Sequence, residues 1–95
     1  MIITIQKASM THTKEDGLVG NVEFLVDTHK EAYEITLYSK NTKEWSYGLH
    51  FLNASGSEEE IFEVEEQLDE NDEYFDLLVD AAKATLPEQS NKASE

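Results

Sequence analysis

Residues 33–51 have the sequence YEITLYSKNTKEWSYGLHF, and they decide the fold because apolar and polar side chains alternate in them. The apolar positions of the first run are Tyr33, Ile35 and Leu37. Those of the second run are Trp45, Tyr47, Leu49 and Phe51. A period of two is typical of strands with one buried and one solvated face, and the turn between the runs is too short for a parallel crossover. The stretch therefore predicts two neighbouring antiparallel strands.

The residues before this stretch continue the same pattern. A β-branched run predicts a strand at 2–10, and alternation predicts another at 18–27. The inward side chains of the second of these are Val22, Phe24 and Val26. Between the two strands lies a turn-rich segment that ends in Asp16-Gly17, a dipeptide typical of hairpins. We therefore expect a four-stranded antiparallel meander within residues 2–52.

The residues after this stretch predict helices that cover the sheet. Ser57 with Glu60 forms a capping-box pattern, and acidic residues in a first turn suit the helix dipole. Apolar residues then recur at spacings of three or four, with a break expected near Asn71: they are Ile61, Val64, Leu68, Phe75, Leu78, Ala82 and Leu86. Residues 73–86 are predicted to form a helix.

The segment 60–66 has a second interpretation, because it also alternates between apolar and acidic residues. A fifth strand is therefore an alternative to a helix there. The fold class expected is α+β, with a four-stranded antiparallel sheet, or a five-stranded one in the alternative, covered on one face by C-terminal helices. We expect a single domain over residues 1–87 and a disordered tail at 88–95, where Pro87 is followed by polar residues with nothing to bury.

Composition excludes several classes of partner. The chain has no cysteine and no arginine, and its formal net charge is −14. Nucleic-acid phosphates would repel such a chain, so direct nucleic-acid binding is not expected, whereas proteins with basic surfaces would be attracted. No segment predicts a signal peptide or a membrane helix, so the expected location is the cytoplasm and no membrane partner is expected.

No pattern in the chain predicts catalysis, a cofactor or a metal ion. The three histidines, at positions 12, 29 and 50, fall in predicted turns or on the polar side of a strand, so we expect them at the surface. The glycines form neither a dinucleotide-binding nor a phosphate-binding motif. The acidic run at 69–80 resembles a calcium loop in spacing, but Tyr74 stands where the sharp turn requires glycine. The protein is therefore expected to be non-enzymatic.

The acidic segment 58–80 is the strongest candidate for function. It holds 12 carboxylates in 23 positions, and no lysine lies between Glu44 and Ala82. On a helix, several of these carboxylates fall on successive turns of one stripe. The candidate partner-binding residues are Glu59, Glu63, Glu66, Glu70 and Glu73.

Two kinds of function fit this segment. The first is a protein-binding or self-assembling domain, in which Tyr38, Phe62 and Tyr74 could form a contact patch or a homodimer surface and an edge strand could pair with a partner. The second is an acidic mimic of nucleic acid that occupies the basic groove of a nucleic-acid-binding protein. The placement of the carboxylates, on one continuous face or scattered, discriminates between them.

Overall fold

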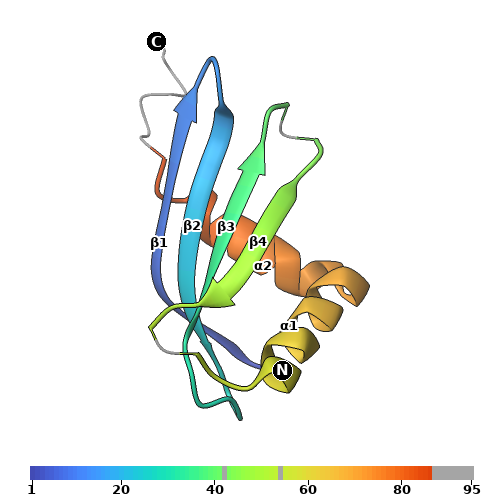
Figure 1. Ribbon diagram of the computed structural model, residues 1–95. Coiled ribbons are helices and arrows are strands. Elements are labelled where there is room, and N and C mark those ends of the chain that lie inside the picture. Colours follow the sequence, from blue (N-terminus) through green and yellow to red (C-terminus); the bar gives the residue numbers. More distant parts are fainter. Residues whose placement is uncertain (42, 54, 87–95) are drawn as a thin grey trace.

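The computed structural model describes residues 1–41, 43–53 and 55–86, and it has one antiparallel sheet with two helices against one of its faces (Figure 1). The elements are β1 Ile3–Thr13, β2 Gly17–Val26, β3 Tyr33–Ser39, β4 Ser46–Phe51, α1 Glu58–Glu70 and α2 Asp72–Lys83. The strand order is β1-β2-β3-β4, so the predicted meander and the α+β class are confirmed. The tail predicted to be disordered, residues 88–95, lies outside the described residues.

The core lies between the helices and the two central strands. The predicted inward side chains of β3 are completely buried, and those of β2 lie beside them in register: Val22 pairs with Ile35, and Phe24 with Tyr33. From the helices, the principal buried side chains are Val64, Leu68, Leu78, Val79 and Ala82. The aromatic rings of Tyr33 and Phe51 stack with centroids 5.6 Å apart, which extends the core to β4.

A bulge in β1 decides which of its side chains reach the core. Ile5 pairs with Phe24 and Lys7 pairs with Glu23, so Gln6 has no partner in β2. An extra residue in one strand reverses the alternation beyond it. Met10 is therefore buried and Lys7 is exposed, which is the opposite of what uninterrupted alternation from Ile5 would give. The strand also continues to Thr13, beyond the end predicted at residue 10.

The helices resolve the alternative that the sequence left open at residues 60–66. This segment belongs to α1, whose first turn is capped by Ser57: its Oγ accepts the Glu60 N–H at 3.3 Å. The predicted break is confirmed at Asn71, which ends α1 and precedes α2, although its side chain makes no capping hydrogen bond. The second helix ends at Lys83, three residues before the predicted end. Helix α2 packs against β1 and β2, and α1 packs against β4.

Candidate protein-binding surface

The outer face of α1 combines carboxylates with one exposed aromatic ring. The helix turns Val64 and Leu68 toward the sheet, so residues on the opposite side of its axis face solvent. Phe62 is on that side and is 64% exposed. The side chains that share its surroundings are Glu59, Glu60, Glu63 and Glu66. No residue of α1 is basic, so the charged side chains of this helix near the phenyl ring are all acidic.

The structure brings only some of the five predicted site residues together. Glu59, Glu63 and Glu66 line a shallow hollow on α1 together with Phe62. Glu70 is exposed at the end of the same helix, one turn beyond Glu66. Glu73 is also exposed, but it belongs to α2, beyond the break at Asn71. The carboxylates are thus distributed over two helices, and the cluster around Phe62 is the part of the predicted site that forms a compact group.

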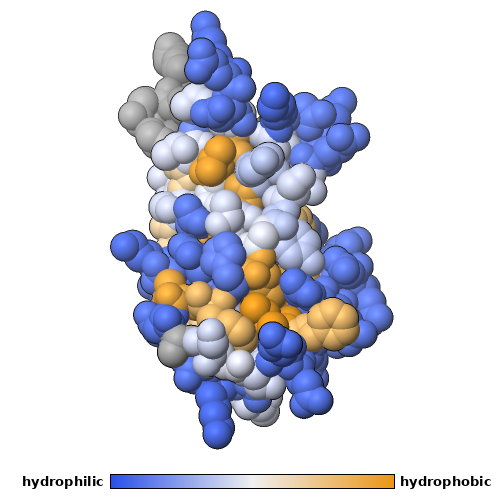
Figure 2. All heavy atoms as spheres, in the orientation of Figure 1, coloured by the Kyte–Doolittle hydropathy of each residue, from blue (hydrophilic) through white to orange (hydrophobic). Residues whose placement is uncertain are grey.

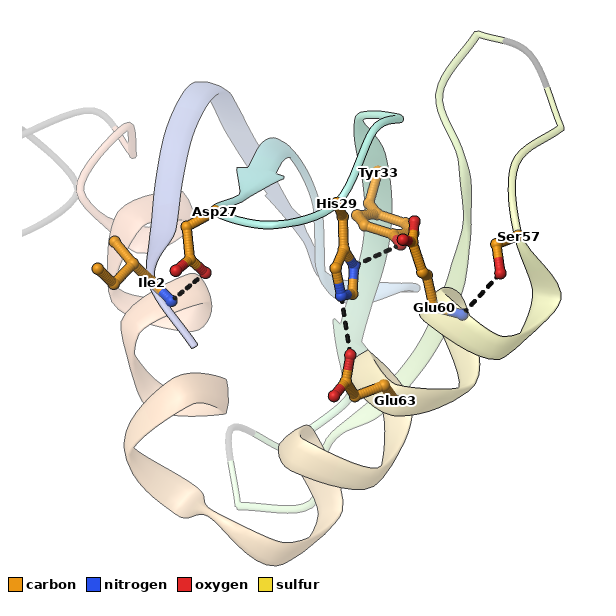
Figure 3. Close-up of polar contacts among 7 residues, drawn as sticks. All are labelled: Ile2, Asp27, His29, Tyr33, Ser57, Glu60 and Glu63. Carbon is orange, nitrogen blue, oxygen red and sulfur yellow. Dashed lines mark hydrogen bonds and ion pairs between the residues drawn. The ribbon is translucent and has the colours of Figure 1, made fainter.

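Glu63 is held by a chain of polar contacts that sequence reasoning missed (Figure 3). Its Oε1 lies 2.9 Å from Nε2 of His29, whose Nδ1 lies 2.8 Å from the hydroxyl of Tyr33. An ionised carboxylate can only accept hydrogen bonds, so Nε2 carries a proton and donates a hydrogen bond to Glu63. With a neutral ring, Nδ1 then accepts a hydrogen bond from Tyr33. This chain joins the β2–β3 loop to α1.

The expectation that all three histidines lie at the surface is therefore wrong for His29. Its side chain is only 4% exposed, because the loop folds it between Tyr33 and α1. By contrast, His50 is 50% exposed on β4, with its Nε2 3.5 Å from Oε1 of Glu34. No local pattern distinguishes His29, since its partner on α1 is 34 residues away in the chain.

The Tyr33–His29–Glu63 chain contains residue types found in catalytic relays, but its tyrosine is not accessible to a substrate. Burial, together with the nearby charges of Glu60 and Glu63, raises the pKa of Tyr33 to about 12. A tyrosine hydroxyl is protonated at neutral pH even at its ordinary pKa, and the raised pKa makes its ionisation harder still. Tyr33 is also completely buried. A nucleophile needs an exposed atom and a depressed pKa or an adjacent base that is free to act. We therefore assign this chain a positioning role: it holds the side chain of Glu63, in the second turn of α1, against the β2–β3 loop.

A second set of acidic side chains lies on the side of α1 that faces β4. This acidic row consists of Glu58, Glu65 and Asp69. The hydroxyl of Tyr47 donates a hydrogen bond to Oδ1 of Asp69 at 3.1 Å. Burial raises the pKa of Tyr47 to about 12, and the hydrogen bond to Asp69 and the charge of Glu65 act in the same direction. At the other end of this row, Phe51, Ile61 and Phe62 line a shallow apolar hollow whose rim is Glu58 and Glu59.

The three exposed aromatic residues expected to form one contact patch are separated in the structure. Tyr38 is 50% exposed, but it lies on the sheet face that the helices leave uncovered. Tyr74 is partly buried on α2, where its hydroxyl lies 3.4 Å from the amino group of Met1. Phe62 is therefore the one member of this set that belongs to the acidic surface of α1.

Comparison with known proteins adds no assignment. No protein-family model matches the sequence, and no curated protein or solved structure matches it significantly. Among residues 1–41, 43–53 and 55–86, no helix is long and apolar enough to span a membrane. In the same ranges, no three histidine or acidic side chains are grouped so that they could hold a metal ion.

Proposed function

We propose that this protein is a non-enzymatic binding domain that contacts a basic protein through the outer surface of α1. The observation that carries the proposal is the exposure of Phe62 beside Glu59, Glu63 and Glu66, with which it lines a shallow hollow on α1. Protein interfaces concentrate their binding energy in a few central residues, aromatic ones above all, surrounded by a polar rim that excludes water. The arrangement around Phe62 has this composition.

The chemistry of the surface specifies the partner. The ring of Phe62 would enter an apolar pocket, and the surrounding carboxylates would pair with lysine or arginine side chains at its rim. The large negative charge of the chain would speed the encounter with such a partner and would oppose the approach of a second copy of itself. Self-assembly through this surface is therefore less favourable than binding to a basic protein.

A second candidate function is mimicry of a nucleic-acid backbone. It is favoured by the exposed carboxylates of Glu59, Glu66 and Glu70, which lie on one side of α1 over about three turns without a compensating lysine. Two observations weigh against it: Phe62 lies beside two of these carboxylates, and Glu63 is already engaged by His29. Under mimicry, the carboxylates would carry the binding and the phenyl ring would contribute little.

A comparative capture from native lysate discriminates between the two candidates. The immobilised wild-type protein is compared with Phe62→Ala and with the double variant Glu59→Gln/Glu66→Gln. The matched controls are Leu77→Ala, which truncates an exposed apolar residue of α2, and Glu15→Gln/Glu44→Gln, which removes two exposed charges elsewhere.

We expect a protein with a basic surface to be retained by the wild type and both controls. It should be lost with Phe62→Ala and released at lower salt with Glu59→Gln/Glu66→Gln. A nucleic-acid-binding protein that Phe62→Ala still retains and the double variant loses would instead support mimicry. Retention of the same proteins by every variant would refute a role for this surface.

A further inference from the structure

Strand β4 forms one edge of the sheet. Among residues 1–41, 43–53 and 55–86, it pairs with β3 alone, so its other edge has no strand partner there. Residues in an antiparallel pair alternate between those that exchange hydrogen bonds and those that do not. The Leu52 N–H donates to the Ala32 carbonyl at 3.0 Å, which fixes the phase of this alternation. The backbone groups of Tyr47, Leu49 and Phe51 therefore point away from β3.

This edge lacks the protection that the opposite edge has. Exposed edge strands commonly carry lysine, proline or a bulge, any of which discourages pairing with another chain. At the other edge, β1 has Lys7 and the bulge at Gln6. By contrast, β4 has the sequence SYGLHF, and its pairing with β3 continues from Ser46 to Phe51 without a register shift. Its row of outward N–H and C=O groups is regular.

A shallow hollow, called the trough below, lies at the Phe51 end of β4. Phe51, Ile61 and Phe62 form its apolar lining. Figure 2 shows apolar side chains gathered over the lower end of β4, with hydrophilic side chains on both sides. The charged side chains of α1 nearest to it are all acidic: Glu58 and Glu59 at the hollow, and Glu65 and Asp69 around Tyr47.

We propose that an extended segment of a partner protein, carrying apolar and basic side chains in alternation, adds to β4 as a fifth strand. Its backbone would pair with the outward groups of Tyr47, Leu49 and Phe51. Its apolar side chains, on the face that the helices cover, would pack on Ile61 and Phe62. Its lysine or arginine side chains would lie on the opposite face of the added strand, and the net charge of −14 on the chain would attract them. The inference deepens the proposed function, on which it rests, because it states the conformation and chemistry of the segment that the partner contributes.

Charge complementarity selects this occupant over the others. A second copy of the chain would bring a second set of carboxylates to the same trough, which like-charge repulsion opposes. A nucleic acid would be repelled for the same reason. An extended basic segment gains both backbone pairing and favourable electrostatics, and its side-chain alternation matches the two faces of an added strand.

The test uses a seven-residue peptide of alternating lysine and valine. Two methylated forms are compared with it, one N-methylated at the valines and the other at the lysines. An added strand directs alternate N–H groups toward its neighbour, so one pattern removes the pairing donors and the other removes only solvent-facing ones. A peptide of alternating lysine and glycine controls for charge. The readouts are affinity and amide hydrogen exchange of the full chain.

We expect the lysine–valine peptide to bind at least tenfold more tightly than the lysine–glycine peptide. One N-methylation pattern should abolish binding while the other leaves it within threefold, and the amides of Tyr47, Leu49 and Phe51 should become protected. Equal binding of both methylated peptides, with loss on Phe62→Ala, would overturn strand addition but leave the proposed function standing. Protection of these amides without peptide, with a mass that doubles with concentration, would assign the edge to a second copy and overturn the inference.

Discussion

The Nε2 atom of His29 lies 2.9 Å from Oε1 of Glu63, and through this contact the β2–β3 loop holds α1 at the residue next to Phe62. The other ring nitrogen of His29 bonds the buried hydroxyl of Tyr33. The His29 side chain thus gives the buried Tyr33 hydroxyl a hydrogen-bond partner. It also positions the Glu63 carboxylate of the proposed binding surface. The core and the candidate site are linked through it.

Replacing this histidine should destabilise the fold. In His29→Leu, the volume is nearly kept, but the Tyr33 hydroxyl loses its partner, and an unsatisfied buried group costs about 1–3 kcal/mol. The measurement is urea denaturation, with His50→Leu as the matched control at an exposed site. Glu63→Gln, which keeps an acceptor for Nε2, should lose less than His29→Leu does. Equal stability of the two leucine variants would contradict the role of His29.

Deleting Gln6 should be tolerated, even though it lies inside a strand. The residue has no partner in β2, and without it the alternation would still direct Ile5 and Met10 toward the core. Deleting Ser9 instead would turn Met10 outward, and exposing a side chain of this size costs about 1.5–3 kcal/mol. Thermal denaturation of the two deletion variants checks this. The account of the bulge fails if the Gln6 deletion is as destabilising as the Ser9 deletion.

Alkaline pH should unfold the protein through the buried Tyr33 and the partly buried Tyr47. Burial raises the pKa of both Tyr33 and Tyr47 to about 12, and their acidic neighbours contribute to the shift. An unfolded tyrosine titrates near pH 10, so the folded state binds these protons more tightly. The resulting stability is complete below about pH 10 and is lost as the pH rises toward 12.

Tyr47→Phe should therefore show a shallower loss of stability between pH 10 and 12 than the wild type. Denaturant midpoints measured at several pH values across this window provide the comparison. A variant whose midpoint falls as steeply as that of the wild type would show that Tyr47 does not contribute.

Salt should stabilise the protein. The formal charge is −14, and the acidic residues of α1 have no basic neighbour on their own helix. Like charges one turn apart cost a few tenths of a kcal/mol each, and salt screens such repulsion. The melting temperature should therefore rise between about 10 mM and 500 mM sodium chloride, and it should rise less in Glu59→Gln/Glu66→Gln. Equal melting temperatures of the wild type at both concentrations would refute the prediction.

Local periodicity was sufficient to predict the sheet and α2. Residues 33–51 specify two strands by their own alternation. The inward side chains named for the first run are completely buried, whereas those named for the second run, Trp45, Tyr47, Leu49 and Phe51, are only partly buried against the core. The segment 60–66 was ambiguous because both periods place Val64 inside. What separates them is the next apolar position, Leu68, which is buried one helical turn later, together with the cap at Ser57. As a consequence, Phe62 is exposed instead of sharing a face with Val64.

The features that sequence could not predict depend on contacts between distant residues. The bulge at Gln6 exists only in relation to β2, and the burial of His29 requires α1 to lie beside the β2–β3 loop. The candidate site was predictable in part: spacing identified the stripe of α1, but the break at Asn71 separates Glu73 from it. The role proposed for Phe62 depends on which face of α1 the core occupies, and that is a tertiary property.

The most direct test of the central claim is site-specific photocrosslinking in native lysate. Phe62, Leu77 and Tyr38 are replaced, one at a time, by photoreactive benzoylphenylalanine, which keeps an aromatic ring at position 62. The account predicts a discrete adduct with a basic protein from position 62 and none from the exposed positions on α2 and on the open sheet face. Equal adducts from all three positions, or an adduct from position 38 alone, would contradict it.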